Sequence, residues 1–202
     1  MRFVILNETD LHVRDFAALD DMIDGALVVG SAAKGLEFAY GAGAFNLTKA
    51  IRPGLVYEEE VKSYDEYIFG NRIPHCDLNL PYFSAMFPLS SGKMGCYFRR
   101  KMKNVEEGRC AYTTEVVVHA TTLSMPLEAV IITVDPQSLF CKGLNEEQKF
   151  LLNVDLPHTN SGKEYIIVSC SLIWTNKDDV SIVVRSPIIL STKYTSVRIF
   201  EP

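Results

Sequence analysis

A short basic segment offers the clearest capacity for chemistry in this sequence. Tyr97 and Phe98 lead directly into a run in which four of five residues are Lys or Arg, and further cations flank the run on both sides. Each phosphate that a Lys or Arg neutralises releases counterions, so such a run can bind nucleic acid or anionic lipid head groups. We therefore predict an anionic-surface binding site formed by Lys93, Arg99, Arg100, Lys101, Lys103 and Arg109.

The alternative is that this segment is a solvated β-hairpin. Glu106 and Glu107 follow the run, and their carboxylates would neutralise part of its charge. In a strand, successive side chains point to opposite faces, so Arg99 and Arg100 cannot both be buried. At least one of these two arginines is therefore expected to be exposed.

His75, Cys76 and Asp77 form the most suggestive cluster for nucleophilic catalysis. A Cys nucleophile needs a base and an orienting carboxylate, and these three residue types are present. Adjacent side chains in a loop generally point apart, however, and catalytic triads are assembled from distant positions. The sequence also has no Gly-x-Ser-x-Gly motif. We therefore predict no catalytic residue and no enzyme activity, with a hydrolase that uses His75 and Cys76 as an alternative.

No metal or cofactor site is predicted. The Gly- and Ala-rich segment 25–45 lacks the Lys of a Walker A loop after Gly30, and Asn46 stands where a dinucleotide fingerprint needs Gly. Close packing of small residues is the simpler interpretation of this segment. The four histidines have no second ligand at a chelating spacing; they are His12, His75, His119 and His158.

The cysteines are dispersed, odd in number and never spaced as Cys-x-x-Cys. This pattern argues against a disulfide framework and against a structural zinc site. We predict free thiols and an intracellular location, cytoplasmic or nuclear, or a place within a virion. The five cysteines are Cys76, Cys96, Cys110, Cys141 and Cys170.

Composition and charge limit the class of protein. The 202 residues are 48% hydrophobic, which is enough for one domain with a sizeable core. The net charge is −5, and residues 1–80 hold 7 Lys or Arg against 13 Asp or Glu, so a general affinity for nucleic acid is not expected. No apolar stretch reaches the roughly 20 residues that span a bilayer, so we predict neither a transmembrane segment nor a signal peptide.

Period-two alternation runs through the second half of the chain, from Cys96 to Phe200. β-branched and aromatic residues alternate there with polar ones, between short turn signals. Because no crossover helices separate these segments, we expect antiparallel pairing in a β-sandwich or a jelly-roll-like barrel. The predicted strands are 97–103, 111–122, 127–135, 148–155, 164–174, 179–186 and 194–200.

Two amphipathic helices are predicted in the first half of the chain, at residues 10–23 and about 56–69. Apolar residues recur at helical spacing in both segments. We expect these N-terminal helices to pack on the sheet. The chain 1–202 is then a single β-rich α+β domain, with a helical and loop-rich portion at 1–92 and an antiparallel β portion at 93–202.

A resemblance to matrix proteins of rabies-like negative-strand viruses is confined to residues 62–71. It consists of the run Lys-Ser-Tyr-Asp-Glu at 62–66 and of Gly-Asn at 70–71, which are similar to a helix segment of those proteins. The resemblance implies a compact mixed α/β domain that self-assembles beneath a membrane. The basic N-terminal arm and the Pro-Pro-x-Tyr motif expected of that family do not occur in this sequence, so no functional residue is transferred.

A β-rich domain without a catalytic or cofactor motif favours a non-enzymatic structural or self-assembling protein. We predict a viral capsid, matrix or movement-type protein that forms homo-oligomers and has nucleic acid or an anionic membrane surface as a partner. Apolar residues on both faces of the strands at 164–174 and 179–186 favour self-association, since a sheet with one wet face would not need them. The alternative is a regulatory protein-binding module.

Overall fold

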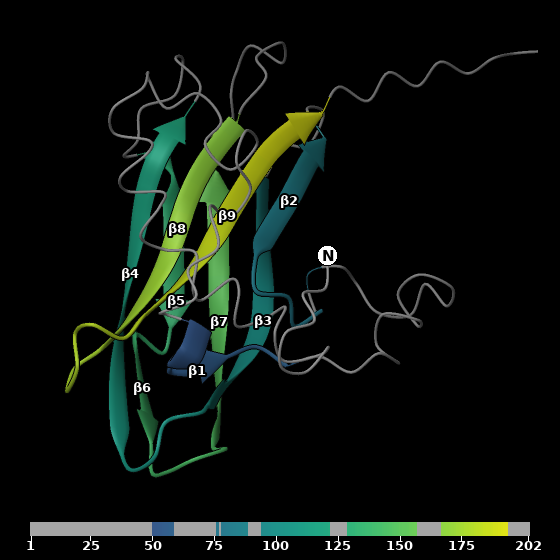
Figure 1. The fold of residues 1–202 in the computed structure, drawn as a ribbon. Helices are drawn as coiled ribbons and strands as arrows, with labels where there is room; N and C mark the ends of the chain where they lie inside the picture. The colour runs from purple at the N-terminus through teal and green to yellow at the C-terminus, as the bar shows by residue number, and fades with distance from the viewer. Residues whose placement is uncertain are drawn as a thin grey trace, which may run out of the picture.

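Nine β-strands are found in the part of the chain that the structure describes (Figure 1). The structure is a computed structural model, and it describes residues 50–58, 76, 78–88, 94–121, 129–156 and 167–193. The strands are β1 (Leu55–Val56), β2 (Phe83–Pro88), β3 (Met94–Asn104), β4 (Cys110–Thr121), β5 (Ile131–Asp135), β6 (Ser138–Cys141), β7 (Glu147–Leu156), β8 (Ile167–Asn176) and β9 (Val183–Lys193).

The strands form two sheets that pack face to face. One sheet has four strands in the order β1-β3-β7-β5, and the other has five in the order β2-β9-β8-β4-β6. Long antiparallel pairs dominate both sheets: β3 with β7, β4 with β8, and β8 with β9. Figure 1 shows β4, β8 and β9 in front of β3, β5 and β7. The predicted β-sandwich is therefore confirmed for the described residues.

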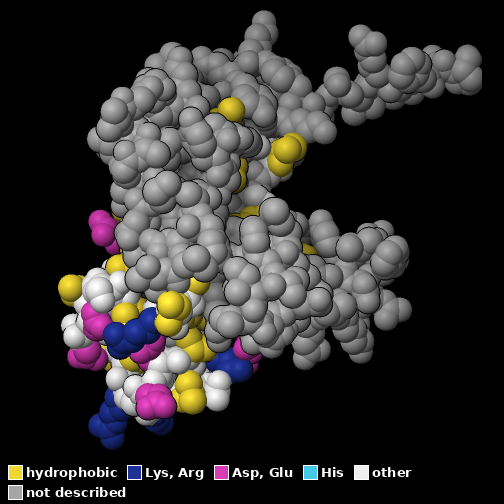
Figure 2. Space-filling view, viewed as in Figure 1, with side chains coloured by type: hydrophobic (Ala, Val, Ile, Leu, Met, Phe, Trp, Pro, Cys, Tyr) yellow, Lys and Arg dark blue, Asp and Glu magenta, His cyan; other side chains and the backbone are white. Residues whose placement is uncertain are grey.

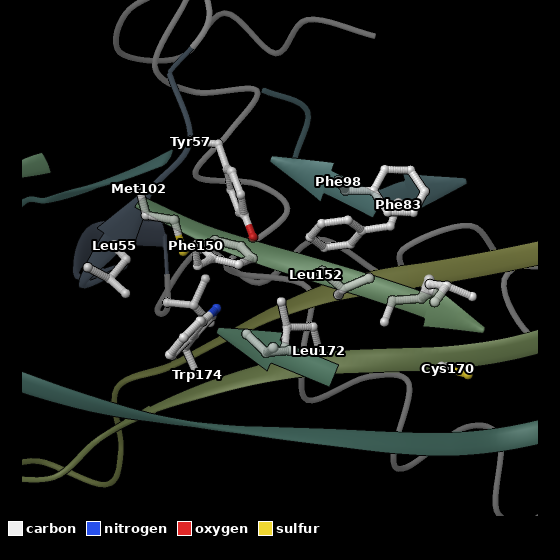
Figure 3. Close-up of a cluster of buried hydrophobic side chains, with 14 of the residues drawn as sticks. Leu55, Tyr57, Phe83, Phe98, Met102, Phe150, Leu152, Cys170, Leu172 and Trp174 are labelled. Carbon is white, nitrogen blue, oxygen red and sulfur yellow. The ribbon is translucent and has the colours of Figure 1, made fainter. Parts of the chain in front are cut away.

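Apolar side chains from both sheets fill the space between them (Figure 3). Along β7, buried Phe150 and Leu152 alternate with exposed Leu151. The Phe150 ring lies 5.3 Å from the ring of Trp174 and 6.3 Å from the ring of Phe83, both of which belong to the opposite sheet. Each side chain of this size contributes roughly 1.5–3 kcal/mol when it is fully buried. The period-two pattern thus produces one core, because each strand directs one face inward.

The strand predictions agree with most of the observed strands. The segments predicted at 97–103, 111–122, 148–155 and 164–174 overlap β3, β4, β7 and β8. The segment predicted at 127–135 overlaps β5, which begins at Ile131. The segment at 194–200 lies outside the described residues.

The strand predicted at 179–186 begins late, because a turn occupies its first residues. The side-chain oxygen of Asn176 accepts a hydrogen bond from the amide of Asp179 (3.2 Å). The carboxylate of Asp179 accepts one from the amide of Ser181 (3.1 Å). Side chains that bind nearby backbone amides in this way favour turns over strands. As a result, β9 begins only at Val183.

The expectation of purely antiparallel pairing is wrong at one place. β2 pairs in parallel with β9, so that Phe83 lies opposite Ile188. Parallel neighbours need a long crossover connection. Here the chain between β2 and β9, which includes most of both sheets, provides that connection in place of a helix. The prediction also missed β1, β2 and β6, which have two, six and four residues and so show little of the alternating period.

The predicted N-terminal helices are not supported by the structure. The helix at 10–23 lies outside the described residues, as does most of the helix at 56–69. Val56, where the second helix is predicted to begin, lies instead in β1 and pairs with Lys103 of β3. Its side chain is buried, so sheet pairing determines the conformation at this point. The portion predicted as helical and loop-rich therefore contributes β1 and β2 to the sandwich.

Gly54 brings the chain into β1 through a conformation that other residues rarely adopt. Its φ is +75°, and a Cβ at this position would lie 2.4 Å from Cγ2 of Ile182 and 2.6 Å from the hydroxyl oxygen of Tyr112. Gly108 has a φ of +85°, but no atom lies within 4 Å of the corresponding position. The two glycines therefore share a backbone requirement and differ in the space around them.

We expect Gly54→Ala to lower the free energy of unfolding by about 3 kcal/mol and Gly108→Ala by only about 1 kcal/mol. Both substitutions place a side chain in the left-handed region, but only the first also overpacks the core. Urea denaturation followed by circular dichroism measures both losses. Equal losses would contradict the steric explanation for Gly54.

Candidate functional site

The side chain of Arg100 points into the protein and not toward solvent. Arg100 lies on the inner face of β3 and is 3% exposed. Its guanidinium donates hydrogen bonds to the carbonyl oxygens of Cys76 (2.6 Å), Leu80 (3.0 Å), Arg99 (2.9 Å) and Tyr82 (3.3 Å). The planar guanidinium can make several such bonds at once. Arg100 therefore joins the segment before β2 to β3.

Aromatic groups surround the same guanidinium. Its central carbon lies 5.0 Å from the ring centroid of Phe83 and 5.3 Å from that of Phe98, distances at which a cation is attracted to a ring face. Burial raises the pKa of Tyr57 to about 12, although a hydrogen bond with Ser186 and the charge of Arg100 act in the opposite direction. The Tyr57 hydroxyl, 2.8 Å from the Ser186 hydroxyl, is thus neutral at physiological pH.

Asn79 reinforces the connection between the segment before β2 and β3. Its side-chain nitrogen donates to the carbonyl oxygens of Glu58 (2.8 Å) and Lys101 (2.9 Å). Its side-chain oxygen accepts a hydrogen bond from the Lys101 amide (2.7 Å). Asn79 is 5% exposed, and its amide therefore replaces a strand partner at this edge of β3.

Three cations of the predicted anionic-surface site, Arg99, Lys101 and Lys103, lie on the outer face of the four-stranded sheet. The guanidinium carbon of Arg99 lies 4.7 Å from the ring centroid of Tyr97. The ammonium of Lys101 lies 3.6 Å from the carboxylate of Glu147. The expectation that one of the two adjacent arginines is exposed is confirmed, since Arg99 is exposed and Arg100 is buried.

By strand alternation, Lys103 lies on the same face of β3 as Arg99 and Lys101. Lys103 is paired with the carboxylate of Glu58 at 3.0 Å. Arg109 is exposed just before β4, and Lys93 lies outside the described residues. On the face seen in Figure 2, described Lys and Arg side chains are interspersed with Asp, Glu and hydrophobic ones. Binding to an anionic surface stays a prediction, and Arg100 is directed away from such a surface.

A groove of about 550 Å³ lies beside the exposed cations, on the outer face of the four-stranded sheet. Strand pairing explains its composition, because Asp135 of β5 lies opposite Leu151 of β7, and Leu151 lies opposite Arg99 of β3. The groove therefore combines an apolar centre with charges of both signs. Its lining residues are Asn79, Arg99, Arg100, Lys101, Asp135, Lys149, Phe150 and Leu151.

A Ser–His contact that the sequence prediction missed lies between β4 and β8. Nε2 of His119 lies 2.6 Å from Oγ of Ser171. A base beside a hydroxyl is the arrangement that activates a serine nucleophile. Ser171 is 0% exposed, however, so a substrate carbonyl has no path to its oxygen. The two residues are far apart in sequence, and a register shift in β4 between Val118 and Ala120 positions His119, so no local motif could reveal the contact.

The structure describes only part of the predicted cluster of His75, Cys76 and Asp77. Cys76 is half-buried and its carbonyl oxygen binds Arg100, whereas His75 and Asp77 lie outside the described residues. Within the described ranges, no group of three or more His, Cys, Asp or Glu side chains could hold a metal ion. No helix in this part of the chain is long and apolar enough to cross a membrane.

Comparison with known proteins identifies a domain family and a class of relatives. Residues 77–190 match the model of the fibronectin type-III domain. The subtilisin-like protease SBT4.10 of Arabidopsis thaliana is 31% identical over 193 residues, which cover 85% of this chain and 26% of that protein. The subtilisin-like protease SBT4.1 of the same plant is 30% identical over 180 residues, which cover 76% of this chain and 22% of that protein. The chain thus spans about a quarter of the length of these curated relatives.

Solved structures resemble the chain only distantly. The periplasmic chaperone SfaE aligns with 59% of this chain and 57% of its own at 13% sequence identity, with a TM-score of 0.36. A likeness at this level supports no inference about function.

These relatives overturn the predicted class of protein. The prediction of a viral capsid, matrix or movement-type protein is wrong, because the relatives are plant subtilisin-like proteases and the matching region is a fibronectin type-III domain. The ten-residue resemblance to viral matrix proteins is too short to compete with similarity over most of the chain. The predicted intracellular or virion location is wrong as well, because it conflicts with the similarity to plant subtilisin-like proteases. Self-association stays a prediction.

Proposed function

Because the chain belongs to the fibronectin type-III family through residues 77–190, we propose that it serves as a non-catalytic β-sandwich domain of a subtilisin-like protease. The observation that carries this proposal is the asymmetry of coverage. The two relatives described above match 76–85% of this chain but only 22–26% of their own length. A segment of that kind is one domain of a larger enzyme, and the rest of the enzyme provides the chemistry.

The geometry of the described residues supports a non-catalytic role. Catalysis by a serine protease requires an accessible hydroxyl, a base and donors for the oxyanion. In the described part of the chain, the Ser171 hydroxyl beside His119 is fully buried. The buried Arg100 and Asn79 bind backbone carbonyls, so they stabilise the sandwich.

The outer face of the four-stranded sheet is the surface that we assign to contact with the protease portion. Tyr97, Ile131 and Leu151 are large apolar residues on this face, and they are 51%, 56% and 37% exposed. Strand alternation places all three on the side opposite the core, next to the groove. Apolar side chains bordered by charges are typical of protein contact surfaces.

Two assays test the non-catalytic role. We expect the purified chain to hydrolyse no fluorogenic peptide and to remain unlabelled by a fluorophosphonate probe, because Ser171 is inaccessible. Intact subtilisin-like protease serves as the positive control for both assays. Labelling of Ser171 that disappears in Ser171→Ala would show that the chain has a reactive serine and would contradict the non-catalytic role.

A binding assay tests the assigned contact surface. The chain is mixed with a subtilisin-like protease that lacks the matching segment, and complex formation is measured by sedimentation velocity. We expect Tyr97→Glu and Leu151→Glu to weaken the complex at least about tenfold, since each places a charge in an apolar contact. Phe140→Glu is the matched control, because Phe140 is also an exposed apolar residue but lies on β6 of the other sheet. Absence of a complex, or equal weakening by all three variants, would refute the assignment.

A further inference from the structure

Two cysteines that are distant in sequence lie directly opposite each other in the five-stranded sheet. The register of β4 and β6 pairs Cys110 with Cys141. Directly opposite residues of an antiparallel pair point to the same face of the sheet. Both thiols are free in this structure, and both side chains are buried at 6% and 3% exposure. The two cysteine side chains therefore lie next to each other on the buried face of the sheet.

The strand geometry at this pair permits a covalent bond. The Thr114 amide donates to the Gln137 carbonyl (3.1 Å), and the same register continues to Cys110 and Cys141. Hydrogen-bonded pairs recur at every second position, so Cys110 and Cys141 form such a pair, for which the Cα atoms are roughly 5.5 Å apart. Disulfides prefer Cα separations of roughly 5.5–6 Å. The expected Cα separation of this pair therefore falls within the range of disulfides.

Contact between the thiols supports the same geometry. Each thiol lies close enough to the other to affect its pKa. Burial raises the pKa of Cys141 to about 12 and raises that of Cys110. The thiolate form is therefore scarce while β6 remains docked, and reaction requires local opening of this strand. Such opening is accessible, because β6 has four residues and lies at the edge of its sheet.

We propose that Cys110 and Cys141 form a cross-strand disulfide that joins β6 to β4, with a low-molecular-weight disulfide as the oxidant. One cysteine thiolate attacks the external disulfide, forms a mixed disulfide and releases one small thiolate. The sulfur of the second cysteine then attacks the mixed disulfide, forms the Sγ–Sγ bond and releases the second small thiolate. The protein loses two protons and two electrons, and the external disulfide is reduced to two thiols.

The proposed disulfide does not depend on the proposed function. All five cysteines are free thiols in this structure, as the sequence predicted, and the disulfide would form from this state on oxidation. Oxidation would close a loop from Cys110 to Cys141 and prevent β6 from separating from β4. The redox state would therefore determine the stability of this edge of the sandwich.

Peptide mapping of the wild-type protein tests the cross-link directly. The chain is incubated with glutathione disulfide, alkylated and digested with trypsin, which leaves both cysteines in the peptide 110–142 because no Lys or Arg lies between them. We expect this peptide to lose the mass of two hydrogens and to carry no alkyl group. A second cleavage after Glu115 or Glu128 should leave the two halves joined until a reductant is added. A doubly alkylated peptide, or two separate adducts with glutathione, would overturn the proposal.

Thermal unfolding supplies the matched controls. We expect oxidation to raise Tm by roughly 10 °C and dithiothreitol to reverse the rise, because the cross-link restricts the unfolded chain. The rise should disappear in Cys110→Ala and in Cys141→Ala. It should persist when Cys76 and Cys96 are both replaced by Ala, since neither belongs to the pair. A rise that survives in Cys110→Ala would assign the effect to another pair and refute the proposal.

Discussion

Arg100→Met is expected to lower the free energy of unfolding by about 4 kcal/mol. The Met side chain fills a similar volume but cannot donate to the carbonyl oxygens of Cys76, Leu80 and Tyr82, which then stay buried without this partner. Each buried acceptor left unsatisfied costs about 1–3 kcal/mol, and partial relaxation of the segment reduces the total. The attraction between the guanidinium and the ring of Phe83 is lost as well. Urea denaturation, followed through the fluorescence of Trp174, measures the loss.

Two further variants separate the geometry of Arg100 from its charge. Arg100→Lys keeps the charge but has a compact ammonium in place of the planar fork, so we expect an intermediate loss of about 2 kcal/mol. Arg99→Met removes the same type of side chain at the neighbouring, exposed position. We expect it to lower the free energy of unfolding by less than about 0.5 kcal/mol. If Arg100→Met and Arg99→Met were equally stable, the buried guanidinium would have no structural role.

We also expect Phe150→Ala to lower the free energy of unfolding by about 4 kcal/mol. The Phe150 ring is 4% exposed and lies between the sheets, within 5.3 Å of the Trp174 ring. Removal of the ring leaves a cavity that the two sheets cannot close without a change in their spacing. Because Trp174 is the only Trp in the chain, its emission should also shift to longer wavelength as water approaches the cavity.

Leu151→Ala is the matched control for this cavity. Leu151 is the next residue along β7 and points to the opposite face, where it is 37% exposed. We expect Leu151→Ala to lower the free energy of unfolding by less than about 1 kcal/mol and to leave the Trp174 emission unchanged. Chemical denaturation of both variants under identical conditions gives the comparison. A loss from Leu151→Ala as large as that from Phe150→Ala would mean that the outer face is also tightly packed.

Similarity over most of the chain, and no local motif, indicates the class of protein to which this chain is related. The basic run beginning at Arg99 has the composition of an anion site, yet the structure directs Arg100 inward and pairs Lys103 with Glu58. The residue types of this run give the number of positive charges but not the groups that each charge contacts. Three of the four carbonyl oxygens that bind Arg100 belong to a segment about twenty residues earlier, and no local pattern connects the two.

Alternation along the chain was sufficient to predict the long strands and their two faces. For β3, β4, β7 and β8 the period of two is local, since it follows from the pleat of each strand alone. The same rule predicted that Arg99 and Arg100 would differ in exposure, and they do. It could not predict which of the two is buried, because that choice depends on the register of β3 against the core.

Contacts between distant strands were decided only in the folded sandwich. The parallel pairing of β2 with β9, the approach of His119 to Ser171 and the pairing of Cys110 with Cys141 all depend on register between separate segments. A shift of one residue in any of these pairs would turn the side chains to the opposite face. Burial of the shared core selects one register among many, and that selection is a property of the whole domain and not of any one strand.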